Sequence, residues 1–132
     1  MAVVSDLAGL DPDLATAREL GGSAATDKDA PHAEGEPGPA AHEALAALER
    51  TLHERQSEQP EGSYTVELLS DPKRIGAKVT EEAEEVTRAA REESEQRVAE
   101  EAADLLYHLS VLLLSRGVDQ TDVMEVLNGR RL

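Results

Sequence analysis

Two pairs of carboxylates are the residues of this chain whose types and spacing could do chemistry. Glu82 and Glu85 form the first pair, and Glu101 and Asp104 form the second. A spacing of three residues puts both members of a pair on one helix face, within reach of a single ion. Asp104 is flanked by Ala and Leu residues, and a buried charge requires a counter-charge or a metal. We therefore expect a divalent-cation site clamped between two antiparallel helices.

Magnesium is the cation that these donors favour. The sequence has no cysteine, which leaves carboxylate oxygens and histidine as the available ligands. Mg²⁺ prefers hard oxygens and is usually held by a few carboxylates together with substrate phosphates. A water held by the metal, or by one of the neighbouring acids Glu81 and Glu84, could be deprotonated and attack a phosphoanhydride.

Less specific interpretations compete with this one. Among 28 acidic residues, pairs of acids three residues apart also arise by chance on solvated helix faces. Asp104 fits that explanation poorly because it interrupts an apolar helix. For His108 a hydrogen-bonded core histidine is favoured over a metal ligand. Lys78 lies one turn before Glu82, where its spacing favours a salt bridge over a phosphate contact.

Four helices and a short helical turn must position these residues. Leu45, Leu48 and Leu52 recur at helical spacing, and Asp71 followed by Pro72 is typical of a helix start. Ser94 can cap the next helix, and Gly117 can end it. The predicted ranges are 41–57, 66–69 for the turn, 72–92, 94–116 and 119–127.

The helix predicted over 94–116 is the hub of the fold. Its second half has no polar face, as expected of a helix enclosed on most sides. With no Phe or Trp and only two Tyr, the core must consist of small and aliphatic side chains. Small helical chains often complete such a core by pairing with a second copy. We expect an all-α fold, an antiparallel helical bundle completed by homodimerisation.

Residues 1–40 differ in composition from residues 41–132. They hold four of the six Pro and five of the nine Gly, which is typical of a linker. One short helix is possible from Asp11 to Leu20, and we expect residues 21–40 to be disordered. The sequence therefore predicts a low-complexity, largely disordered extension over 1–40 and one all-α domain over 41–132.

The net charge of -15 excludes a general affinity for nucleic acid or an anionic membrane surface. No segment is long and apolar enough to span a bilayer, and the N-terminus lacks the pattern of a signal peptide. We expect a soluble, cytoplasmic protein. Only three residues are Lys; this would suit a high-salt cytoplasm, although an ordinary acidic protein is an equal alternative.

Three strings occur in fixed order: EGSYT at 61–65, KVTEEAEEV at 78–86 and EAADLLYHL at 101–109, followed by Arg-Gly-Val at 116–118. Together they resemble phosphoribosyl-ATP pyrophosphatase, the enzyme of the second step of histidine biosynthesis. The resemblance extends from about Leu45 to the end of the sequence. One pair of acids alone would be weak evidence, whereas this ordered combination is specific.

The resemblance implies a member of the all-α nucleotide pyrophosphatase superfamily. Such an enzyme hydrolyses phosphoribosyl-ATP to phosphoribosyl-AMP and pyrophosphate, with Mg²⁺, as a homodimer. By residue it implies metal ligands at Glu82, Glu85, Glu101 and Asp104, catalytic roles for Glu81 and Glu82, and substrate contacts from Lys78, Arg74 and Tyr64.

The chain departs from the family pattern at Thr80, where we expect Gly, and at Glu84, where an uncharged residue is commoner. Neither position is a predicted ligand. We recognise no cyclohydrolase domain, which is often fused to this enzyme, so we expect another chain to catalyse the next step. Two alternatives stay open: a related pyrophosphatase that hydrolyses ordinary or damaged nucleoside triphosphates, and a non-enzymatic acidic module that dimerises.

Overall fold

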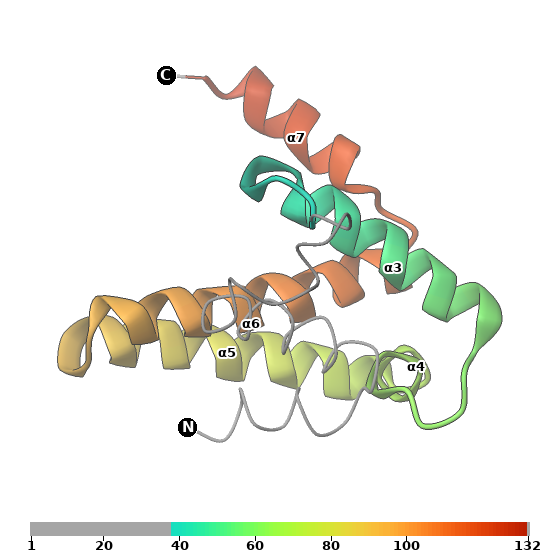
Figure 1. Ribbon diagram of the computed structural model, residues 1–132, viewed down its shortest axis with the longest axis horizontal. Helices are drawn as coiled ribbons and strands as arrows, with labels where there is room; N and C mark the ends of the chain where they lie inside the picture. The colour runs from blue at the N-terminus through green and yellow to red at the C-terminus, as the bar shows by residue number, and fades with distance from the viewer. Residues whose placement is uncertain (1–37, 132) are drawn as a thin grey trace.

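The computed structural model describes residues 38–131, and all of their regular structure is helical (Figure 1). The prediction of an all-α fold is confirmed for this part of the chain. The elements are the 3₁₀ helix η2 (Ala41–Glu43) and the α-helices α3 (Ala44–Glu58), α4 (Tyr64–Leu69), α5 (Pro72–Glu92), α6 (Glu95–Ser115) and α7 (Gln120–Gly129).

The two long helices begin where the sequence signals predicted. The Asp71 side chain accepts a hydrogen bond from the backbone N–H of Arg74, and Pro72 occupies the first position of α5. Ser94 accepts from the backbone N–H of Arg97 at 3.2 Å and so caps α6. Each cap satisfies a backbone donor that the first turn of a helix leaves without a partner.

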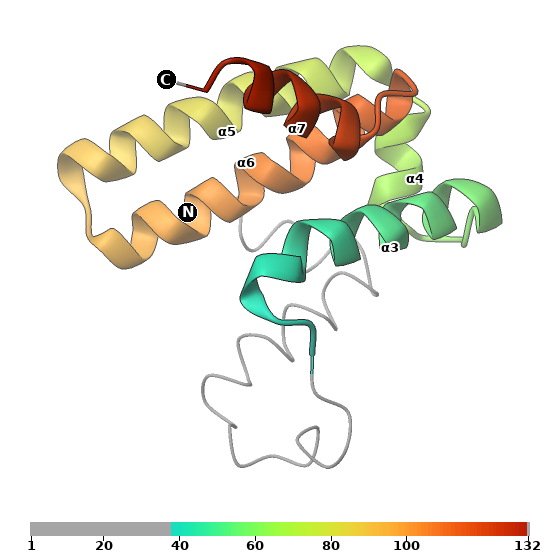
Figure 2. The same ribbon diagram turned by 90° about the horizontal axis from the view of Figure 1, so that it is seen from above.

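Helices α5 and α6 form an antiparallel hairpin, and they lie side by side in both views (Figures 1 and 2). Only Glu93 and Ser94 separate them. Each has 21 residues, which corresponds to about 32 Å of helix. The short α4 lies at one end of the hairpin, where it links α3 to α5 (Figure 1). The hairpin is therefore the frame on which both predicted acid pairs are placed.

The hydrophobic core fills that end of the hairpin. It joins side chains of four helices, α3 to α6, which are Leu52, Tyr64, Leu68, Ile75, Tyr107 and Val111. All are at most 4% exposed. This core anchors α6 on one side, and the predicted acidic site lies further along the hairpin, toward the α5–α6 turn.

The second half of α6 is buried or half-buried on most sides, as interpreted from the sequence, but one edge is exposed in the single chain. Leu106 is 42% exposed and Leu109 is 36% exposed, three residues apart on one face of α6. The packing partners α3, α4 and α5 cover the opposite face of α6. Because this half of α6 has no polar side, the face that they leave uncovered exposes apolar residues to water. Helix α7 likewise has no buried residue.

Two expectations concern residues 1–37, which lie outside the described part of the chain: the short helix from Asp11 to Leu20, and most of the disordered stretch 21–40. The first described element begins at Ala41, where the composition changes. Among residues 38–131, no helix is both long enough and apolar enough to cross a membrane.

Candidate metal and substrate site

Three of the four predicted ligands converge in the middle of the hairpin. Glu82 comes from α5, and Glu101 and Asp104 come from α6. One carboxylate oxygen of each lies within 4.8 Å of the others. All three residues are at most 1% exposed. The structure thus brings three acids from two helices into one buried cluster.

The electrostatics of this cluster favour a cation. Burial raises the pKa of Glu82 to about 7; Lys78 opposes this shift, and the Asp104, Glu81 and Glu101 carboxylates add to it. Burial also raises the pKa of Glu101, against the effect of Arg97. Within residues 38–131, neither Glu82 oxygen nor Oε1 of Glu101 has a hydrogen-bond partner. Buried carboxylate oxygens of this kind fit a hard divalent ion such as Mg²⁺.

Lys78 lies at the edge of this cluster and contacts two acids of its own helix. Its Nζ is 3.3 Å from Oε1 of Glu81 and 3.6 Å from Oε2 of Glu82. Burial lowers the pKa of Lys78, but Tyr64, Glu81 and Glu82 outweigh this effect and raise it. The ammonium is therefore a permanent positive charge beside the carboxylates. The Glu81 side chain is 50% exposed and borders the cluster from the solvent side.

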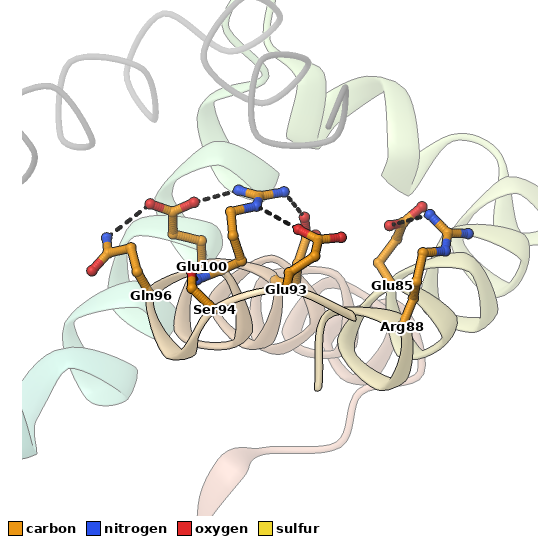
Figure 3. Close-up of polar contacts among 8 residues, drawn as sticks. Glu85, Arg88, Glu93, Ser94, Gln96 and Glu100 are labelled. Carbon is orange, nitrogen blue, oxygen red and sulfur yellow. Dashed lines mark hydrogen bonds and ion pairs between the residues drawn. The ribbon is translucent and has the colours of Figure 1, made fainter. Parts of the chain in front are cut away.

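Glu85, the fourth predicted ligand, is not one of the three clustered acids. It is 8% exposed, and its Oε1 accepts a hydrogen bond from Nη1 of Arg88 at 3.0 Å (Figure 3). Its charge still raises the pKa of Glu101, so the two acids interact. The residues Thr80 and Glu84, which depart from the family pattern, are exposed.

A buried polar group supports the cluster from the core side. Nδ1 of His108 lies 2.9 Å from the backbone carbonyl of Asp104, and Nε2 lies 3.0 Å from the Tyr64 hydroxyl. A carbonyl only accepts, so Nδ1 carries the proton and Nε2 accepts from Tyr64. Burial lowers the pKa of His108 to about 4. The expectation of a hydrogen-bonded core histidine is confirmed.

Arg74 lies over the ring of Tyr64, with 5.4 Å between its guanidinium carbon and the ring centroid. Its Nη1 is 3.6 Å from Oε1 of the exposed Glu67. The Tyr64 ring is 1% exposed, so Tyr64 serves as a platform that holds Arg74 at the surface through a cation–π contact. Two of the three predicted substrate residues, Arg74 and Tyr64, thus belong to one unit.

Comparison with known proteins adds the decisive observation. Residues 45–131 match the family model described as phosphoribosyl-ATP pyrophosphohydrolase. The chain belongs to this family. The matched range contains all three clustered acids as well as Glu85, Lys78 and the Arg74–Tyr64 unit, and it ends within the described residues.

Named relatives of the phosphoribosyl-ATP pyrophosphohydrolase family are similar over the same region. The phosphoribosyl-ATP pyrophosphatase of Leptospira biflexa is 43% identical over 89 residues, 67% of this chain and 97% of the relative. The histidine biosynthesis bifunctional protein HisIE of Bacillus subtilis is 48% identical over 84 residues, and that of Escherichia coli is 47% identical over 87 residues. These regions are 63% and 65% of this chain. They cover 40% and 43% of the bifunctional relatives' lengths.

Sequence reasoning missed Arg97, whose guanidinium contacts the clustered Glu101. The only signal was that Arg97 lies four residues before Glu101. Several other acids in the sequence also have a basic residue four positions earlier, so the spacing did not single out this pair. It also missed the pairing of Thr65 Oγ1 with the Tyr107 hydroxyl at 2.5 Å, since the two residues are 42 positions apart.

A second group of possible metal ligands, Glu49, His53 and Asp119, meets where α7 begins beside α3. There Oε2 of Glu49 accepts a hydrogen bond from the backbone N–H of Gln120 at 2.9 Å. The contact satisfies an otherwise unpaired N–H in the first turn of α7, so Glu49 has a structural role at this junction.

Proposed function

We propose that this protein hydrolyses the α–β phosphoanhydride of phosphoribosyl-ATP and releases phosphoribosyl-AMP and pyrophosphate, the second step of histidine biosynthesis. The observation that carries the proposal is the buried cluster of Glu82, Glu101 and Asp104 in a chain of the phosphoribosyl-ATP pyrophosphohydrolase family. Two basic side chains, Lys78 and Arg97, contact these three acids, so the cluster keeps an excess of acidic groups that a bound cation would offset.

Magnesium is the proposed cofactor, held by Glu82, Glu101 and Asp104, with Glu85 as the predicted fourth ligand. Their hard oxygens and their burial fit Mg²⁺. When bound, the ion would neutralise negative charge that develops on the phosphates. Glu85 would join this set through a change in its side-chain conformation. Arg88, which binds its Oε1, has an exposed side chain that can move with it or turn into solvent.

The chain's own residues supply the remaining functions in this proposal. Lys78 contacts a substrate phosphate with its ammonium, which lies beside the cluster. Arg74, held on the Tyr64 ring, provides a second cation for the substrate. Glu81 and Glu82 orient the attacking water and accept its proton. Because Glu81 is half exposed and pairs with Lys78, it can exchange that contact for one with water.

We also propose that the protein acts as a cytoplasmic homodimer. Support comes from the apolar residues that the single chain exposes on α6 and α7, among them Leu106 on α6 and Leu127 on α7, the latter 61% exposed. Monomeric proteins rarely leave large apolar patches in water. A second copy would cover them and complete the small core.

Pyrophosphate release from three substrates tests the activity. Purified protein with Mg²⁺ receives phosphoribosyl-ATP, ATP or dUTP in turn. We expect release from phosphoribosyl-ATP. Release from ATP or dUTP alone would assign the chain to the housekeeping pyrophosphatases, and release from none would support the non-enzymatic module.

Variants connect the activity to the cluster. Asp104→Asn and Glu82→Gln keep the side-chain size and should each lower kcat by at least about 100-fold, because each removes a charged oxygen from the reacting site. Glu92→Gln removes an exposed acid at the far end of α5 and should keep wild-type activity. Wild-type activity in Asp104→Asn would contradict the proposal.

A further inference from the structure

Arg97 lies on α6 one turn before Glu101, and its guanidinium contacts three carboxylates. Nε donates to Oε1 of Glu93 at 3.1 Å, Nη1 donates to Oε1 of Glu100, and Nη2 donates to Oε2 of Glu101. Figure 3 shows Glu93 and Glu100 converging on this group, and Gln96 holds the other Glu100 oxygen at 2.8 Å. All three guanidinium nitrogens therefore have acidic partners.

These contacts divide the two oxygens of Glu101 between two tasks. Oε2 is bound by Arg97, whereas the buried Oε1 has no hydrogen-bond partner among residues 38–131. A carboxylate fixed through one oxygen has little freedom to rotate. Glu101 clusters with Glu82 and Asp104, so its buried Oε1 is an oxygen that remains available to a cation.

We propose that Arg97 is a positioning residue for metal binding, which orients Glu101 through Oε2 and leaves Oε1 for the divalent ion. The inference rests on the proposed function for the identity of the ligands. Glu93 and Glu100 contribute to the same positioning, because they hold the Arg97 guanidinium that orients Glu101. Partners of metal ligands commonly change metal affinity by 10-fold to 100-fold.

A direct substrate contact is the competing role for Arg97. Each nitrogen already donates to a carboxylate, so Arg97 could bind a phosphate only by releasing one of these acids. The guanidinium side chain is also only 25% exposed. The geometry therefore favours orientation of Glu101 over a contact with substrate.

The test is the affinity for Mn²⁺ alone, measured by isothermal titration calorimetry without substrate. We expect Arg97→Gln to bind Mn²⁺ about 10-fold more weakly than wild type, and Arg97→Lys to lie between them, because an ammonium cannot hold three carboxylates as a planar fork does. Loss of a positive charge would by itself tighten cation binding, so weaker binding reports lost orientation. Arg91→Gln is the control, because Arg91 is exposed and pairs with Glu92.

A second set of variants leaves Arg97 and Glu101 in place. Glu93→Gln with Glu100→Gln should weaken Mn²⁺ binding several-fold in wild type and cause a smaller loss when Arg97→Gln is already present. Circular dichroism establishes that each variant is folded. Equal losses in both backgrounds would show that the two acids act only through their charge and would overturn the positioning role.

The outcomes separate this inference from the proposed activity. Unchanged or tighter Mn²⁺ binding in Arg97→Gln overturns the inference, and a raised KM with unchanged Mn²⁺ affinity would assign Arg97 to the substrate. Absence of Mn²⁺ binding in wild type also overturns it. If wild type binds Mn²⁺ in an Arg97-dependent way but does not hydrolyse phosphoribosyl-ATP, the proposed activity fails and the positioning role stands.

Discussion

Glu82 and His108 are the two buried residues whose protonation most affects the folded state. Burial raises the pKa of Glu82 from 4.5 to about 7 and lowers that of His108 from 6.5 to about 4. Both shifts favour the neutral form. The contribution of Glu82 to the free energy of unfolding has its full value below pH 4.5 and is lost as the pH rises to about 7. The contribution of His108 has its full value above pH 6.5 and is lost as the pH falls to about 4.

These opposite signs predict a pH dependence that one substitution exposes. Between pH 4.5 and 6.5 the contributions of Glu82 and His108 offset each other in wild type. Glu82→Gln removes the contribution of Glu82, so the free energy of unfolding of this variant should rise with pH relative to that of wild type. The difference between the two proteins should change by about 3 kcal/mol between pH 4.5 and 7. Urea unfolding with a metal chelator, followed by circular dichroism, measures it.

Glu92→Gln is the control for this pH series and should follow the wild-type curve, because Glu92 is exposed. A difference between wild type and Glu82→Gln that stays constant from pH 4.5 to 7 would mean that Glu82 is not held neutral by burial.

At the level of elements, short capping motifs determine where each helix begins and ends. They thereby determine which residues belong to the α5–α6 hairpin. Helix α6 ends in a Schellman motif, in which the backbone N–H of Val118 donates to the carbonyl of Leu113 at 2.9 Å and that of Gly117 to Leu114 at 3.0 Å. Gly117 has a φ of +71° there. This fixed end sends the chain from α6 into α7.

The same substitution at two glycines should have opposite effects. Gly117→Ala places a Cβ in a left-handed conformation and should lower the free energy of unfolding by about 1–2 kcal/mol. Gly76→Ala lies inside α5, where an added Cβ meets nothing within 4 Å, and should raise it by about 0.5–1 kcal/mol. Thermal or urea unfolding of both variants measures the pair, and a stabilised Gly117→Ala protein would contradict the conformational argument.

For the whole molecule, two features act in opposite directions on self-association. The apolar residues exposed on α6 and α7 favour burial against another surface. The net charge of -15 favours separation of two copies at low salt, and added salt screens this repulsion. The proposed homodimer should therefore strengthen with ionic strength.

Leu106→Glu tests the dimer. A carboxylate on the exposed face of α6 would lose its hydration in an interface, so we expect wild type to be dimeric and the variant monomeric by size-exclusion chromatography with light scattering at moderate salt. Thr87→Glu adds the same charge at an exposed position of α5 and should stay dimeric. A monomeric wild type at all salt concentrations would exclude the dimer.

The sequence by itself determined the features that depend on short-range physics. Caps, Pro and Gly signals predicted α5 over 72–92 with both ends correct, and α6 to within one residue at its end. The spacing of the acids predicted which helix face they share. These signals act within one or two turns of backbone, so neighbouring residues alone determine them.

Only the tertiary structure decided which of these acids meet. The pairing of α5 with α6 places Glu82 with Glu101 and Asp104 but leaves Glu85 with Arg88, because the side-chain conformation and the facing helix select among acids with equivalent spacing. The tertiary structure also decided that Leu106 stays exposed, since the burial of a residue depends on what packs against its helix and not on the composition of the helix itself.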